Sequence, residues 1–283
     1  MTSIDGADYG KLEEAARLPV PVATIGGLPI AVIDRLESAK LMIDLALARR
    51  GTGKRALVVT SANGQVLSMC ESDPHVRSLF LASDLIHADG MSLVFASRLL
   101  SSTPLPERVA TTDLIYETAE IAEGRGASFY FVGATNQVIE RAVANLRRLY
   151  PRLRIVGYRD GYFGRDAEVR TIEEINLKQP DILWLGLGVP LEQMFAMRNR
   201  DRLRGVGVIK TSGGLFDFLS GRNSRAPDWM QSAGLEWAYR VYLEPRRLAA
   251  RYAATNPHAL FLLMTRTKYA GLNSGTSEAV PKC

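Results

Sequence analysis

Several residue types that mark common protein classes are scarce in this chain of 283 residues. Its two cysteines, Cys70 and Cys283, cannot form the disulfide framework of a small secreted domain and favour a reducing compartment. No apolar run approaches the roughly 20 residues that a membrane-spanning helix needs. Acidic side chains are spread through residues 1–20, where a secretory signal would be apolar. We therefore expect a cytoplasmic protein without a spanning segment.

Familiar catalytic and cofactor signatures are also missing. The three histidines and two cysteines have no metal-ligand spacing, and neither Gly-x-Ser-x-Gly nor Asp-x-Asp occurs. Gly51-Thr52-Gly53-Lys54 resembles part of a P-loop but precedes an expected strand instead of following one. Gly186-Leu187-Gly188 lacks the third glycine of a dinucleotide fingerprint. We expect no metal and no cofactor.

The charge that is present is unevenly distributed. The formal net charge is +5, and residues 222–268 alone hold eight Lys or Arg against three Asp or Glu. The remainder of the chain is therefore neutral. A basic excess confined to one segment indicates an anionic partner there, which could be phosphate, nucleic acid or an anionic membrane surface.

From residue 22 onward, short apolar runs alternate with helical patterns. Two runs divided by Gly26-Gly27 predict a hairpin, and Asp34 is placed to begin a helix that ends at Gly51. Further strands are expected at 56–60, 85–88, 128–132, 153–156, 181–185 and 207–209. Helices are expected at 113–123, 137–149, 167–178 and 191–202. This alternation predicts an α/β, Rossmann-like fold with a mostly parallel sheet flanked by helices.

The pattern changes after Gly221, where the chain becomes helical, aromatic and rich in arginine, with Pro245 and Pro257 as expected breaks. Arginine forks suit pyrophosphate oxygens, and aromatic residues beside arginines suit a bilayer interface. A basic helix that simply packs on the core is the alternative. We expect a flexible tail at 1–20, an α/β domain at 21–221, a basic amphipathic helical appendage at 222–270 and a second flexible tail at 271–283.

Glycine and small polar residues follow five of the expected strands. These loops begin at Ser61, Asp89, Gly133, Gly186 and Thr211. In an open α/β sheet, ligands bind beyond the carboxyl ends of the strands, and such loops let backbone N–H groups approach phosphates. Glycine at a strand-to-helix turn is also ordinary turn chemistry. The pattern fits a nucleotide-containing ligand.

Asp89 is the acidic residue of greatest interest, because it directly follows a short apolar strand. A carboxylate there could act as a general base, or it could cap the helix expected near Met91. Asp113 is placed as a cap or first-turn acid, and Asp217 could make a buried structural hydrogen bond. We interpret His87 as a packing histidine.

Nine motifs, in order, resemble those of the WecG/TagA/CpsF glycosyltransferases, and the resemblance covers roughly residues 25–266. The motifs are Val59–Asn63, Ala88–Ser92, Pro106–Val109, Phe131–Ala134, Gly157–Phe163, Gly186–Pro190, Gly213–Gly221, Arg225–Trp229 and Gly234–Arg247.

The resemblance implies roles for individual residues. Asp89 matches the family's proposed catalytic base, and Ser61 and Asn63 match a Thr-x-Asn motif that lines the active site. The other implied substrate-binding residues are Arg108, Asp113, Gly133, Gly188, Glu192, Gln193, Gly214 and Asp217. The implied pyrophosphate-binding residues are Arg240, Arg247 and Arg251.

The chain departs from the family's pattern at three places. Glu192 stands where the family has a substrate-contacting Gln, and Gln193 follows it. Thr111 replaces a glycine, and Ala250-Arg251 stands where the family often has two arginines.

As a member of this family, the chain is expected to be an inverting, metal-independent enzyme. It would move a sugar from a UDP-sugar to a polyprenyl-diphosphate-linked saccharide in cell-surface polysaccharide biosynthesis. Its appendage would contact the inner face of the cytoplasmic membrane, and its arginines would neutralise the leaving UDP phosphates.

Two alternatives remain open at this point. One is a non-catalytic nucleotide-sugar-binding subunit of a polysaccharide assembly complex. The other is a nucleic-acid-binding module, which would leave the glycine-ended strands unexplained, so we expect no nucleic-acid partner. The donor sugar, the acceptor and the formation of a homo-oligomer are undecided.

Overall fold

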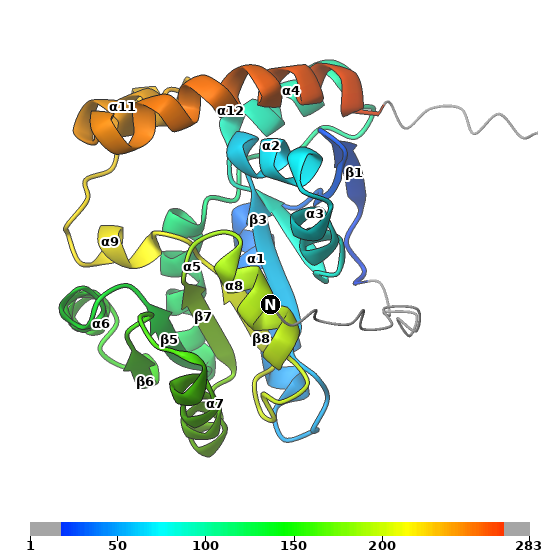
Figure 1. The fold of residues 1–283 in the computed structure, drawn as a ribbon. Helices are drawn as coiled ribbons and strands as arrows, with labels where there is room; N and C mark the ends of the chain where they lie inside the picture. The colour runs from blue at the N-terminus through cyan, green and yellow to red at the C-terminus, as the bar shows by residue number, and fades with distance from the viewer. Residues whose placement is uncertain (1–17, 269–283) are drawn as a thin grey trace, which may run out of the picture.

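The structure is a computed structural model that describes residues 18–268. A six-stranded parallel sheet, in the order β4-β3-β8-β7-β5-β6, forms its centre, with helices on both faces (Figure 1). The strands are β3 (Leu57–Ala62), β4 (Leu85–Ala88), β5 (Ser128–Gly133), β6 (Arg154–Arg159), β7 (Ile182–Gly186) and β8 (Val208–Thr211). The predicted Rossmann-like α/β fold is confirmed.

The first described elements follow the sequence expectations closely. β1 (Val22–Ile25) and β2 (Leu28–Ala31) pair as an antiparallel hairpin. Gly26 and Gly27 have φ of +57° and +85°, which glycine adopts without strain. Asp34 caps α1 (Arg35–Arg49) by accepting from the Glu37 N–H at 2.7 Å, within a capping box.

Most helices connect successive strands. The four expected helices are α5 (Thr111–Arg125), α6 (Asn136–Leu149), α7 (Arg165–Lys178) and α8 (Leu191–Asn199). The short helices α2 (Gly64–Ser72), α3 (Pro74–Leu81), α4 (Met91–Leu100) and α9 (Leu215–Leu219) complete the layers. Because all six strands are parallel, the loops after β3, β4, β5, β7 and β8 meet at one edge of the sheet.

The core lies on both faces of the sheet, since parallel strands are covered on each side. Phe129, Phe131 and Trp184 pack under α1, α5 and α6, whereas Tyr130 and Leu183 pack under α7 and α8. A third cluster joins the hairpin and α2 to Leu262 and Leu263 of the last helix. The C-terminal segment is therefore anchored in the core at its far end.

The C-terminal segment consists of α10 (Asp228–Ser232), α11 (Glu236–Leu243) and α12 (Pro245–Arg266). We call these three helices the roof, because α11 and α12 lie across the carboxyl edge of the sheet (Figure 1). Pro245 separates α11 from α12, as expected, and occupies the first turn of α12.

The second expected break, at Pro257, is wrong, because α12 continues through that residue. His258 Nδ1 lies 2.9 Å from Ser68 Oγ of α2, and Leu262 and Leu263 are buried. These contacts offset the penalty of about 3 kcal/mol that proline imposes on a helix interior.

The ends of the described range are tied to the hairpin and the core. The Gly27 N–H donates to the Arg266 carbonyl at 3.0 Å, and Leu18 and Val20 pack against the core. The other residues of the two expected tails lie outside the described residues, apart from Pro19. Within 18–268, no helix combines the length and apolar character needed to cross a membrane.

Candidate active site

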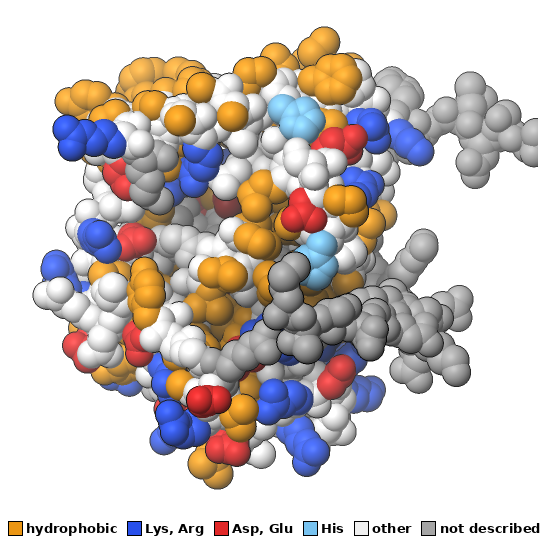
Figure 2. Space-filling model, in the orientation of Figure 1, with side chains coloured by type: hydrophobic (Ala, Val, Ile, Leu, Met, Phe, Trp, Pro, Cys, Tyr) orange, Lys and Arg blue, Asp and Glu red, His pale blue; other side chains and the backbone are white. Residues whose placement is uncertain are grey.

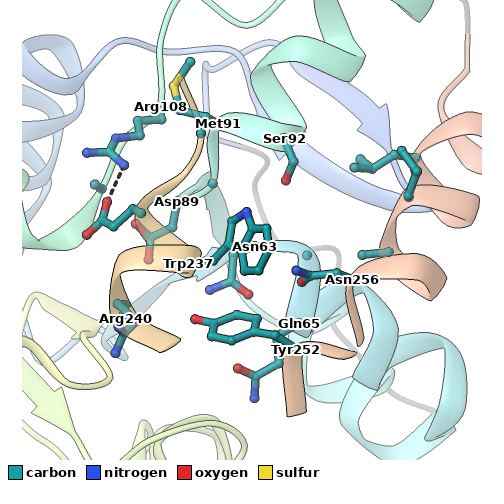
Figure 3. A pocket seen from close by; sticks show the side chains of 18 of the residues that line it. Asn63, Gln65, Asp89, Met91, Ser92, Arg108, Trp237, Arg240, Tyr252 and Asn256 are labelled. Carbon is teal, nitrogen blue, oxygen red and sulfur yellow. Dashed lines mark hydrogen bonds and ion pairs between the residues drawn. The ribbon is translucent and has the colours of Figure 1, made fainter. Parts of the chain in front are cut away.

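A cavity of about 390 Å³ lies between the carboxyl ends of β3 and β4 and the roof. Its polar wall contains Asn63, Asp89, Arg108, Glu236 and Arg240, and its apolar wall includes Trp237, Tyr252, Leu260 and Leu263. In Figure 3 the Asp89 side chain lies between Arg108 and Arg240, with Asn63 and Trp237 beside it. Four of the predicted site residues therefore meet in one cavity.

Asp89 is held at the cavity by the backbone that follows β4. Its N–H donates to the Ala62 carbonyl at 2.8 Å, which fixes the loop to the end of β3. The capping alternative is not supported, because Gly90 is the N-cap of α4 and no side chain caps it. The Asp89 carboxylate is thus available to the cavity.

The electrostatic surroundings of Asp89 suit a base that works near neutral pH. Loss of hydration raises its pKa to about 6, and the neighbouring Glu236 adds to the rise. The positive charges of Lys210, Arg108 and Arg240 oppose it. A carboxyl with this pKa is ionised at neutral pH and is a stronger base than an ordinary aspartate.

Beneath Asp89 lies a group of polar side chains that we call the site floor: Ser61, Thr111, Glu192, Gln193 and Lys210. Lys210 is fully buried on β8, and its ammonium donates to Ser61 Oγ at 2.9 Å and to Thr111 Oγ1 at 3.3 Å. Ser61, predicted to line the site, therefore belongs to a hydrogen-bonded network.

Glu192 and Gln193, at the start of α8, are both buried. Glu192 Oε2 accepts from the N–H of Gly213 at 2.9 Å and of Gly188 at 3.2 Å, so this carboxylate joins the loops after β7 and β8. Gln193 donates to Thr60 Oγ1 at 3.0 Å. Burial raises the pKa of Glu192 to about 7, although the hydrogen bonds from the backbone and the charge of Lys210 both act to lower it.

Arg108 and Asp113, predicted to bind substrate, join the roof to the sheet. Arg108 donates to Glu236 Oε2 at 2.7 Å, the contact dashed in Figure 3. Arg225 donates to Asp113 Oδ1 at 2.7 Å and lies 3.4 Å from Glu236 Oε1. Of the two predicted residues, Arg108 lines the cavity and Asp113 supports it.

The remaining predicted substrate-binding residues follow β5, β7 and β8, outside the lining of the cavity. Gly133 has φ of +152°, and a Cβ there would come within 2.4 Å of the Gly186 carbonyl oxygen. Gly188 lies in the loop before α8, and Gly214 is the N-cap of α9. Asp217, within α9, pairs with Arg222 at 3.4 Å. These positions form a second, glycine-rich part of the same sheet edge.

The three predicted pyrophosphate-binding arginines are distributed along the roof. Arg240 lines the cavity and lies over the Phe218 ring, 5.6 Å from its centroid, and it forms no ion pair with any described residue. Arg251 lies 4.9 Å from the centroid of the Tyr252 ring. Arg247 is in the first turn of α12, and its side chain lies outside what the structure describes.

Sequence reasoning missed Lys210, Glu236, Trp237 and Tyr252 as site residues. A lysine between Ile209 and Thr211, within an otherwise apolar strand, was the available signal for Lys210. The other three lie on helices whose docking geometry no local pattern specified. His87, in contrast, is confirmed as a packing residue, fully buried with Nε2 2.8 Å from Ser38 Oγ. Between residues 18 and 268, no three His, Cys, Asp or Glu side chains are grouped to hold a metal ion.

A parallel Rossmann-like sheet with a carboxylate and arginines in a cavity at its carboxyl edge is an arrangement suited to group transfer from a phosphate-bearing substrate. The chain belongs to the glycosyl transferase WecG/TagA/CpsF family, whose model matches residues 23–271. The expected family is confirmed, and the protein is a glycosyltransferase.

Two relatives carry the name N-acetylglucosaminyldiphosphoundecaprenol N-acetyl-beta-D-mannosaminyltransferase. The protein from Bacillus spizizenii (strain ATCC 23059 / NRRL B-14472 / W23) is 32% identical over 221 residues, 77% of this chain and 84% of its own length. The protein from Bacillus subtilis (strain 168) is 32% identical over 196 residues, 69% of this chain and 74% of its own length.

Proposed function

We propose that this enzyme transfers an amino sugar from a UDP-sugar to a polyprenyl-diphosphate-linked saccharide, with inversion and without a metal ion. The observation that carries the proposal is Asp89, placed in the cavity between Arg108 and Arg240. The names of the two relatives make N-acetylmannosamine the first sugar to test and undecaprenyl-diphosphate-linked N-acetylglucosamine the first acceptor. The reaction would serve cell-surface polysaccharide biosynthesis at the inner face of the cytoplasmic membrane.

The proposed reaction is a single displacement. Asp89 takes the proton of the acceptor hydroxyl, whose oxygen attacks the anomeric carbon as the bond from that carbon to the UDP oxygen breaks. UDP leaves with the bonding electron pair, and its added negative charge is offset by Arg240 and by backbone N–H groups at the glycine-rich edge. Arg240 suits this role because it lines the cavity and forms no direct ion pair with any described carboxylate.

Replacing Asp89 with Asn tests the base. We expect Asp89→Asn to lower transfer at least about 100-fold, because an amide cannot accept the proton. The measurement is UDP release from UDP-N-acetylmannosamine with a short-chain polyprenyl-diphosphate-N-acetylglucosamine. Asp166→Asn, an exposed acid on α7, is the matched control. Near-normal turnover by a folded Asp89→Asn variant would remove Asp89 from this role.

The same assay separates the enzyme from the non-catalytic alternative. A binding subunit would retain UDP-sugar on the wild-type chain yet release no UDP with any acceptor. Transfer by the wild-type protein together with loss in Asp89→Asn excludes that alternative.

The outer face of the roof supports contact with a membrane surface. Figure 2 shows hydrophobic side chains gathered along the edge formed by α11 and α12. Tyr242, Phe261 and Met264 are each at least 59% exposed there. Arg246, in the first turn of α12, is also exposed and would be attracted to anionic lipid. We therefore propose that the roof rests on the bilayer that carries the acceptor.

Vesicle sedimentation tests this contact. The double variant Phe261→Ser, Met264→Ser should bind phosphatidylglycerol vesicles about tenfold or more weakly, because each apolar side chain contributes about 1.5–3 kcal/mol when buried. Leu177→Ser, which changes an 84% exposed leucine on α7, should bind as the wild type does. Equal binding by all three proteins would show that another surface is responsible.

A further inference from the structure

The ammonium group of Lys210 is an unusual feature of the site floor. The residue is fully buried on β8, between β3 and β7, and its three protons have three acceptors. These are Ser61 Oγ at 2.9 Å, Thr111 Oγ1 at 3.3 Å and the Thr211 carbonyl at 2.6 Å. A buried ammonium stabilises the fold less than an apolar side chain of the same length, so Lys210 is a candidate for a functional role.

Two carboxylates flank this ammonium from different loops. Lys210 donates to Ser61, and the next residue, Ala62, accepts from the N–H of Asp89 at 2.8 Å, which places Asp89 beside the ammonium. Glu192, at the start of α8, accepts from the N–H of Gly213, three residues after Lys210. The charges of both carboxylates act on the ammonium through space. Neither forms a direct ion pair with it among the described residues. Lys210 therefore acts on both carboxylates at once, and the Ser61 and Thr111 hydroxyls lie within its hydrogen-bonding shell.

The surroundings of Asp89 contain both signs of charge. The groups that face it are Lys210 from β8, Arg108 from the loop before α5, Arg225 from the loop before α10, and Glu236 and Arg240 from α11. Four of these groups belong to the roof or are bound to it. Lys210 alone belongs to the sheet, so its influence on Asp89 does not depend on how the roof is placed.

We propose that Lys210 is a positioning residue for sugar transfer. From below the cavity it keeps Asp89 ionised and orients the Ser61 and Thr111 hydroxyls, and Glu192 is the counter-ion that keeps Lys210 protonated. The inference rests on the proposed function, in which Asp89 is the base. It also gives the departure at position 192 a reason, because a glutamine there would leave Lys210 without its second carboxylate.

The directions of the pKa shifts agree with this arrangement. Burial lowers the pKa of Lys210 to about 8, and Asp89 and Glu192 both limit that fall. Lys210 in turn lowers the pKa of Asp89, which the burial of Asp89 raises. At neutral pH the ammonium is therefore charged and favours the carboxylate form of Asp89.

Three variants separate this role from simple support of the sheet: Lys210→Met, Glu192→Gln and the double variant. Lys210→Met removes the charge but keeps the length, so the pKa of Asp89 should rise. The acid limb of the profile of kcat/KM against pH, measured with UDP-N-acetylmannosamine and the lipid-linked acceptor, should move up by roughly one pH unit or more. Above pH 7, where Glu192 with its pKa of about 7 is ionised, the thermal unfolding midpoint should also fall, because this carboxylate is then buried without a counter-ion.

The double variant Lys210→Met, Glu192→Gln distinguishes the two roles even if the single variant does not fold. This variant contains neither buried charge, so we expect its thermal unfolding midpoint to return toward that of the wild type. The acid limb of its profile of kcat/KM against pH should still lie at a higher pH than in the wild type. Lys54→Met, at an exposed lysine, should change neither quantity.

The inference would be overturned if the acid limb of the profile of kcat/KM against pH lay at the wild-type pH in a folded Lys210→Met variant. The same result in the double variant would also overturn it. Failure of the proposed function is distinguishable, because Asp89→Asn would then retain turnover. If Asp89→Asn is inactive but the acid limb of the Lys210→Met variant is not shifted, the role of Lys210 is rejected and the proposed function stands.

Discussion

The site is built from two regions that are held in place by different forces. The floor is formed by β3 and β8 together with α5 and α8, and there Lys210 and Gln193 are fully buried and Glu192 is only 2% exposed. In the roof, α12 is anchored in the core through Leu262 and Leu263. Neither α10 nor α11 has a buried residue, and ion pairs and hydrogen bonds of Arg108 and Arg225 join both helices to the α/β domain.

This difference separates two tasks within one cavity. Packing sets the position of Asp89 and its supporting lysine, because a close-packed interior allows few alternatives. Charged pairs at the cavity rim set the position of Arg240 and Trp237. Such pairs are weaker than core packing and respond to salt and substitution, so the placement of α10 and α11 is the easier of the two to perturb.

The largest difference in the free energy of unfolding is expected when one tryptophan from each region is replaced with alanine. Trp184 is fully buried on β7 against Phe129, at 5.7 Å between ring centroids, whereas Trp229 of α10 is 65% exposed. Trp184→Ala should lower the free energy of unfolding by about 3–5 kcal/mol. Trp229→Ala should change it by no more than about 0.5 kcal/mol. Urea unfolding measures both, and equal losses would show that the roof is packed as tightly as the sheet.

An intermediate effect is expected when the roof is released. Arg225 is 23% exposed and contacts Asp113 and Glu236, so Arg225→Met should cost about 1–3 kcal/mol of stability. Transfer should fall by about tenfold or more, because Arg240 is then misplaced over the cavity. Arg222→Met removes an arginine that is 64% exposed, and its stability should change by less than about 1 kcal/mol. Unchanged transfer in Arg225→Met would show that these pairs do not position the site.

The smallest effect is expected from pH, which changes the charge of Asp89 without altering the packing around it. Asp89 must be ionised to accept a proton, and its pKa is raised to about 6, so activity should be lost as pH falls through that value. At pH 5, kcat/KM should be about tenfold lower than at pH 7, since one pH unit below the pKa leaves about a tenth of the base ionised. The rate profile between pH 4.5 and 8 measures this. A limb near pH 4 would indicate that Asp89 is hydrated like an exposed aspartate.

The sheet was predictable because each strand is a short apolar run followed by glycine or a small polar residue, as at Phe129 to Gly133. Asp89 was predictable for the same reason, since it ends such a run. The contact between Arg108 and Glu236 was not, because 128 residues separate them and only the docked roof brings them together. Pro257 failed as a helix break because the packing of Leu262 and Leu263 outweighs a local preference.

The volume of the cavity has a consequence for how the reaction rate depends on the acceptor. About 390 Å³ lies near the lower end of the range that encloses a drug-sized ligand, so the cavity is too small to enclose a polyprenyl chain together with its saccharide. Under the proposed function, the lipid chain stays in the bilayer throughout the reaction. Encounters then occur in two dimensions, and the rate follows the number of acceptor molecules per unit area of membrane, not their concentration in the bulk solution.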